Sequence, residues 1–194
     1  MVHIRISDLE EYARDFHVPI MLKDGIEYLL EYIKNNNIKN ILEIGTAIGY
    51  SSIRMAQVNN DIKVTTIERD SNMYNEALKN IKSFNLDNRI NVIYKDALDV
   101  ELTDKYDLIF IDAAKSQYIK FFNKFKHNLN DNGVIITDNL SFHGLVKDSS
   151  NCSRNTKQLV NKIKKYIEFL KDNKEYETEF ISIGDGISIT KKVN

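Results

Sequence analysis

The chain has 194 residues, of which 42% are hydrophobic and 28% charged, and its formal net charge is −1. This length fits one hydrophobic core, and no apolar run is long enough to predict a membrane span. The net charge gives no overall field that would attract nucleic acid. The single cysteine, Cys152, excludes an internal disulfide, and the opening residues turn acidic where a secretory signal needs an apolar stretch. We therefore expect one cytoplasmic domain over residues 1–194, without a membrane partner.

Apolar runs alternate with helical patterns along most of the chain. Two short helices, Leu9 to Ala13 and Ile26 to Ile33, are expected first, separated by Val18-Pro19. Buried strands are then predicted at residues 40–44, 63–68, 90–94, 106–112 and 133–138. Helices are predicted between or after them at residues 50–58, 71–84, 116–129 and 156–170. This order predicts an α/β fold with a parallel sheet and helices on both faces.

The C-terminal segment follows a different pattern. YETEFISIGDGISIT alternates apolar and polar residues on both sides of Gly184-Asp185-Gly186, which is a tight hairpin signal. The sheet is therefore predicted to end in an antiparallel pair.

The turn in ILEIGTAIGYSS joins the first predicted strand to a helix. Gly45 and Gly49 lack the middle glycine of a dinucleotide motif, and Glu43 would repel a pyrophosphate. The same acid suits a cationic ligand such as S-adenosylmethionine. The carboxylate of that ligand could take the helix N-terminus and the hydroxyl of Ser51 or Ser52.

Two further acidic positions follow predicted strands. Glu68 ends the second strand and could accept both ribose hydroxyls, a device that NAD enzymes also use. Asp96-Ala97 follows the third strand, where an adenine ring could be held. Each signal is weak alone, but their order along the chain favours a nucleotide-like ligand.

Oxygen-bearing side chains also end the fourth and fifth strands, in FIDAAKSQY and IITDNL. Asp112, Asp138 and Asn139 can converge there, because the carboxyl ends of parallel strands share one edge of the sheet. Oxygen ligands without histidine or cysteine favour Mg²⁺. Helix capping and turn formation are the structural alternative for each residue.

These blocks together resemble the Mg²⁺-dependent catechol and caffeoyl-CoA type O-methyltransferases, from about Val18 to the closing GDGISITKK. The resemblance implies a Rossmann-like class I methyltransferase with a seven-stranded sheet, whose N-terminal helices in residues 1–37 cap the active site. It implies Mg²⁺ bound by Asp112, Asp138 and Asn139, with Lys115 near the reacting hydroxyl. It also implies an S-adenosylmethionine site lined by Met21, Glu43, Gly45, Ser51, Glu68, Asp96, Ala97 and Asp112.

Within this family the bacterial tRNA 5-hydroxyuridine methyltransferases look nearest, through HVPIM, FIDAAKSQY and DNLSFHGLV. The 5-hydroxyl and 4-carbonyl of 5-hydroxyuridine are adjacent oxygens that can chelate Mg²⁺ as a catechol does. An unpaired wobble base could stack on Phe142 or His143. Methylation of that base to 5-methoxyuridine in the anticodon loop, by a homodimer, is the function expected from this likeness.

The charge distribution bears on that expectation. Residues 151–174 hold seven basic and two acidic residues, but SSNCSRNTKQ contains only Arg154 and Lys157 where the subgroup has a dense basic run. Lys162, Lys164 and Lys165 could compensate through phosphate contacts. The alternatives are an O-methyltransferase of a small catechol-like phenol and a nucleotide-binding module without catalysis.

Overall fold

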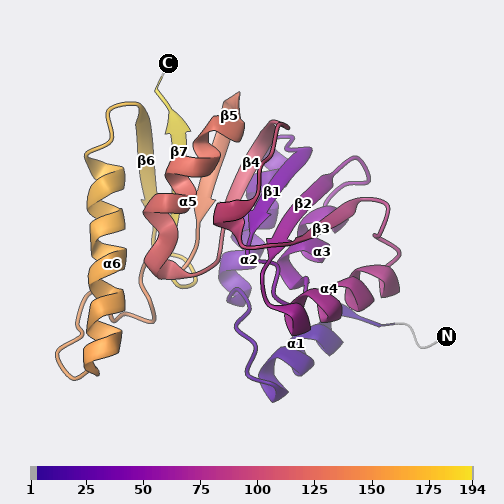
Figure 1. The fold of residues 1–194 in the computed structure, drawn as a ribbon, viewed down its shortest axis with the longest axis horizontal. Coiled ribbons are helices and arrows are strands. Elements are labelled where there is room, and N and C mark those ends of the chain that lie inside the picture. The colour runs from indigo at the N-terminus through magenta and orange to yellow at the C-terminus, as the bar shows by residue number, and fades with distance from the viewer. Residues whose placement is uncertain (1–3, 194) are drawn as a thin grey trace.

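The computed structural model describes residues 4–193 and contains one seven-stranded sheet in the order β3-β2-β1-β4-β5-β7-β6 (Figure 1). The first five strands are parallel, and β7 runs antiparallel to both β5 and β6. The strands are β1 Asn40–Ile44, β2 Lys63–Glu68, β3 Ile90–Tyr94, β4 Tyr106–Ile111, β5 Leu129–Thr137, β6 Tyr176–Ile181 and β7 Ile187–Lys192. The predicted α/β class, the parallel order and the antiparallel C-terminal pair are all confirmed.

Helices cover both faces of this sheet, with α5 and α6 together on one of them (Figure 1). The α-helices are α1 Ile6–Asp15, α2 Lys23–Asn35, α3 Tyr50–Gln57, α4 Ser71–Ser83, α5 Tyr118–Phe125 and α6 Arg154–Lys171. Three short 3₁₀ helices are η1 Ala97–Asp99, η2 Lys115–Gln117 and η3 Lys126–Asn128. Within the described part of the chain, no helix has both the length and the apolar character needed to cross a membrane.

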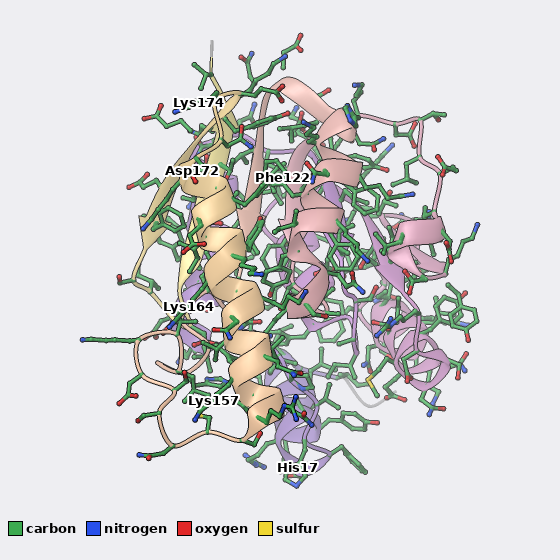
Figure 2. The ribbon with its side chains drawn as sticks, turned by 60° about the vertical axis from the view of Figure 1, so that its left-hand side comes forward. His17, Phe122, Lys157, Lys164, Asp172 and Lys174 are labelled. Atoms are coloured by element: carbon green, nitrogen blue, oxygen red, sulfur yellow. The ribbon has the colours of Figure 1, made fainter. Side chains whose placement is uncertain are left out.

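Successive side chains of the central strands point to opposite faces of the sheet, and so contribute to two separate cores. In β4, Leu108 and Phe110 pack into the core under α2 and α3, whereas Ile109 and Ile111 pack into the core under α5 and α6. Phe122, labelled on α5 in Figure 2, belongs to the second core. Because both faces of β4 are buried, its sequence reads as a continuous apolar run, as is typical of a central parallel strand.

Two predicted elements differ most from the structure. The helix expected at residues 116–129 is broken into η2, α5 and η3, and β5 begins at Leu129 instead of residue 133. Leu129 pairs with Tyr106, and a register shift follows before Leu108 pairs with Val134. Asn130, Asp131 and Asn132 lie between these two pairs, in the irregular part of the strand.

The close approach of β1 to β4 depends on Gly45. Its φ is +102°, and a Cβ atom at this position would lie 2.2 Å from the carbonyl oxygen of Asp112. A side chain is therefore excluded both by conformation and by contact with backbone. Gly45 thus allows the residues that follow these two strands to share one small volume.

We predict that Gly45→Ala lowers the free energy of unfolding by about 3 kcal/mol or more, because left-handed strain and a backbone clash add. Gly144→Ala is the matched control, since Gly144 has a φ of +82° but nothing within 4 Å of the added Cβ. That control should lose only about 1 kcal/mol, from strain alone. Equal losses for both variants, measured by urea unfolding, would contradict the proposed clash.

Candidate active site

A cavity of about 410 Å³ lies at the carboxyl ends of the parallel strands. An open α/β sheet places its ligand at this edge. The segment between α1 and α2, from Pro19 to Leu22, also lines the cavity. Seven of the eight predicted cofactor residues line it: Met21, Gly45, Ser51, Glu68, Asp96, Ala97 and Asp112. The structure thus brings these residues together, and Lys115 and Asn139 line the same cavity.

Glu43 lies beneath the glycine turn and does not line the cavity. Its side chain is fully buried, and its two carboxylate oxygens accept hydrogen bonds from the hydroxyls of Ser51 and Ser52. Burial raises the pKa of Glu43 to about 7, against the opposing effect of these hydroxyl donors. The serine hydroxyls expected to meet a ligand carboxylate are therefore bonded to Glu43, and Glu43 itself secures the start of α3.

Glu68 lies at the end of β2 with its carboxylate held by backbone. The N–H groups of Ala47, Arg69 and Asp70 donate to it over 2.8, 2.9 and 2.8 Å. A carboxylate has about four acceptor positions, so one remains for a ligand hydroxyl. These bonds also tie the turn after β1 to the end of β2.

Asp96 caps the short helix η1 at the cavity wall. It accepts a bond of 2.9 Å from the N–H of Leu98 at the start of η1 and one of 3.2 Å from Arg69. The Leu98 N–H and the Arg69 guanidinium hold the pKa of Asp96 below its ordinary value. The acid therefore shapes the cavity wall at Ala97.

The predicted metal ligands meet at the ends of β4 and β5. Oδ2 of Asp138 accepts a bond of 3.2 Å from the Asn139 amide nitrogen. Among the residues that the structure describes, Oδ1 of Asp138 is buried without a hydrogen-bond partner. Burial, and then the negative charge of Asp112, raise the pKa of Asp138 to about 7. Burial also raises the pKa of Asp112, while the Lys115 ammonium opposes that shift.

Lys115 reaches across this cluster from η2. Its Nζ donates to Oδ1 of Asn139 over 2.7 Å and lies 5.8 Å from the centre of the Phe142 ring. The ammonium is thus placed between an aromatic face and an amide oxygen at the cavity wall. This position leaves its N–H groups able to donate a hydrogen bond to a group bound beside Asn139.

The donor set fits a hard divalent cation. Asp112 and Asp138 supply carboxylate oxygens and Asn139 an amide oxygen, which are the ligands that Mg²⁺ prefers. The unpartnered Oδ1 of Asp138 is a buried acceptor that a cation would satisfy. Within residues 4–193 no group of three acidic, histidine or cysteine side chains is placed to hold a metal, so a cation here would also need the amide oxygen of Asn139.

Sequence reasoning missed two residues of this site. Asp185, read only as part of a turn, is buried beside Asn139 and accepts its amide N–H over 3.4 Å. Tyr118 donates its hydroxyl to the carbonyl oxygen of Asp138 over 3.1 Å. An acid between two glycines, in a hairpin that returns beside β5, was the available signal for Asp185.

Comparison with known proteins defines the class. A family model described as O-methyltransferase matches residues 5–193. A crystal structure from Staphylococcus aureus, provisionally described as a caffeoyl-CoA O-methyltransferase, is 42% identical with a TM-score of 0.93, covering 98% of this chain and 93% of that one. An Arabidopsis thaliana protein with the same provisional description is 29% identical, covering 98% and 84% of the two chains.

A third comparison concerns a structure with a bound ligand. The O-methyltransferase of Bacillus cereus, solved with SAH, has a TM-score of 0.82 and 24% identity, covering 97% of this chain and 90% of that one. At that identity the likeness supports the fold alone. The family match is decisive: the chain belongs to the O-methyltransferase family, and its class is that of an S-adenosylmethionine-dependent O-methyltransferase of the caffeoyl-CoA type.

Burial of Glu43 predicts a measurable pH dependence of stability. The Glu43 carboxyl keeps its proton up to about pH 7 in the folded chain, whereas it loses the proton near pH 4.5 in the unfolded chain. Stability contributed by Glu43 therefore falls as the pH rises through this window, by about 3 kcal/mol in total. The glutamine in Glu43→Gln cannot ionise, so the variant should not lose this stability. Its free energy of unfolding minus that of wild type should therefore rise by about 3 kcal/mol between pH 4.5 and 7.5. A difference that stays constant in urea titrations across this range would refute the assignment.

Proposed function

We propose that this protein is a divalent-cation-dependent O-methyltransferase whose substrate presents two adjacent oxygen atoms, as a catechol-like phenol does. The buried, unpartnered Oδ1 of Asp138 carries this proposal, because Asp138 contacts the amide of Asn139, and Asn139 and Asp112 both line the cavity while Asp138 lies behind this lining. The similarity to proteins named for caffeoyl-CoA methylation supports the phenol as the substrate class.

Asp112, Asp138 and Asn139 are the residues that would hold the cation. When bound, Mg²⁺ would lower the pKa of a coordinated substrate hydroxyl and orient it. Asn139 would then use the amide oxygen that Lys115 contacts in this structure. Lys115 would then lie beside the substrate position, where its neutral amine could take the hydroxyl proton or its ammonium could donate a hydrogen bond to the oxygen.

The other half of the cavity is proposed to bind S-adenosylmethionine, which would supply the methyl group. Glu68 keeps one acceptor position free for a ribose hydroxyl, and Ala97 presents a small apolar wall for the adenine. Met21 lines the same cavity from the segment between α1 and α2. Burial of the reacting groups between these walls would exclude water from the transfer.

Asp138→Ala should abolish methyl transfer to a catechol and leave the Kd for S-adenosylhomocysteine within about twofold, since Asp138 is assigned to the cation alone. Glu68→Ala provides the reciprocal control. It should weaken cofactor binding by about 1 to 3 kcal/mol and leave cation affinity unchanged. The dissociation constants of S-adenosylhomocysteine and of the cation are both measured by titration calorimetry. Full activity of wild type in excess chelator would exclude the metal-dependent reaction.

A second candidate substrate is tRNA carrying 5-hydroxyuridine at the wobble position, methylated to 5-methoxyuridine. The surface of α6 favours it: Lys157 and Lys164 lie along its outer side, with Lys174 beyond its far end (Figure 2). Within residues 4–193, none of the exposed cations of segment 151–174 forms an ion pair. Such a surface can bind phosphates. Action as a cytoplasmic homodimer is part of this second proposal.

A variant of the α6 surface distinguishes the two candidate substrates. If α6 holds tRNA, replacing Lys162, Lys164 and Lys165 by alanine should raise the KM for tRNA and lower the slope of log KM against log salt by about 2. The KM for catechol and the affinity for S-adenosylhomocysteine should not change. Methylation is measured with labelled S-adenosylmethionine.

The matched control removes three exposed lysines from other parts of the surface, Lys34, Lys63 and Lys82. It should leave the KM and the salt slope at the wild-type values. Turnover of catechol together with no turnover of 5-hydroxyuridine tRNA would exclude the second candidate. Turnover of tRNA alone would instead replace the first.

A further inference from the structure

The tip of the β6–β7 hairpin holds an acid in an unusual position. Asp185 lies between Gly184 and Gly186, and its side chain is 2% exposed although hairpin tips are commonly open to solvent. Gly186 has a φ of +84°, and a Cβ atom there would lie 2.8 Å from the backbone nitrogen of Ser141. The tip therefore packs directly against the loop that follows β5.

Backbone hydrogen bonds fasten that loop to the hairpin. The N–H of Leu140 donates to the carbonyl of Gly186 over 2.9 Å, and the N–H of Ser141 donates to the carbonyl of Asp185 over 2.7 Å. The N–H of His143 donates to Oδ1 of the Asp185 side chain. One short hairpin thus satisfies three donors of a single loop.

The same loop has an unfavourable backbone conformation. Asn139, Phe142 and His143 have φ values of +62°, +48° and +55°, in the left-handed region that residues with a side chain rarely adopt. Such a conformation is strained, and persists only where the surroundings impose it. The contacts with Asp185 and Gly186 are the surroundings that impose it here.

Asp185 also fixes which way the Asn139 amide faces. The amide nitrogen lies 3.2 Å from Oδ2 of Asp138 and 3.4 Å from Oδ2 of Asp185. A rotated amide would set its oxygen against two carboxylates and its NH₂ group against the Lys115 ammonium. The two acids therefore direct the amide oxygen away from themselves, to the side where Lys115 contacts it.

We infer that Asp185 is a positioning residue for the reaction. Its carboxylate holds the loop 139–143, with its three left-handed residues, in place and fixes the orientation of the Asn139 amide, whose oxygen is proposed to bind the cation. The loop part of this inference follows from the contacts alone, whereas the part that concerns the cation rests on the proposed function. Loss of outer ligand contacts of this kind weakens metal binding by about 10- to 100-fold.

Asp185→Asn and Asp185→Glu test the cation part. Mn²⁺ alone is titrated by calorimetry into protein loaded with S-adenosylhomocysteine. Both variants should bind Mn²⁺ at least about tenfold more weakly and bind S-adenosylhomocysteine within about twofold of wild type. Asp131→Asn, at an exposed position of β5, is the matched control and should change neither constant.

Comparison of the two variants separates the effect of the position of the carboxylate from the effect of its charge. Asp185→Glu keeps the negative charge but moves the carboxylate by one methylene group. Wild-type Mn²⁺ affinity in Asp185→Glu with weak binding in Asp185→Asn would mean that charge alone matters, and would overturn the inference. Absence of Mn²⁺ binding by wild type would overturn the proposed function instead.

A fluorescent reporter tests the loop part without any metal. The chain has no tryptophan, so Phe142→Trp introduces a single one into the loop. In this background, Asp185→Asn should increase acrylamide quenching at least about twofold, because the released loop exposes its ring to solvent. Asp131→Asn should leave quenching unchanged. Equal quenching with and without Asp185→Asn would overturn the loop part, whatever the metal affinities are.

Discussion

The site depends on how closely β1 and β4 approach at their carboxyl ends. A Cβ atom at Gly45 would lie 2.2 Å from the carbonyl oxygen of Asp112, so only glycine permits this contact. The approach places the turn after β1 and the acid after β4 in the wall of one cavity. Glu68 then ties the same turn to β2 through the N–H of Ala47. Three strand ends are thereby held in fixed relation before any ligand binds.

Because these strand ends lie together, their acidic side chains also lie together, and these acids fall into two groups. Glu43, Glu68 and Asp96 each accept hydrogen bonds from nearby hydroxyl, backbone N–H or guanidinium groups, and serve the architecture of the turns. Burial raises the pKa values of both Asp112 and Asp138, and the negative charge of Asp112 adds to the shift of Asp138. A divalent cation would stabilise their charged forms.

Strand positions could be predicted from sequence because buried parallel strands are continuous apolar runs, as NILEI and YDLIFI are. Convergence of Asp112, Asp138 and Asn139 followed from the rule that parallel strands end at one edge. The early start of β5 was not predictable, because it depends on pairing of Leu129 with Tyr106. Nor was the role of Asp185, since its contact with Asn139 joins positions 46 residues apart, through a hairpin that packs on a loop.

The central claim is that Asp112, Asp138 and Asn139 form one cation site beside the cofactor cavity. A crystal structure with S-adenosylhomocysteine and Mn²⁺, with anomalous scattering measured at the manganese edge, tests it most directly. The account predicts one anomalous peak about 2.0 to 2.3 Å from an oxygen of each residue, close to the distances of Mg²⁺. It also predicts that the Lys115 nitrogen has left the Asn139 oxygen. Absence of a peak at these three residues, with S-adenosylhomocysteine bound and Lys115 still on Asn139, would contradict the account.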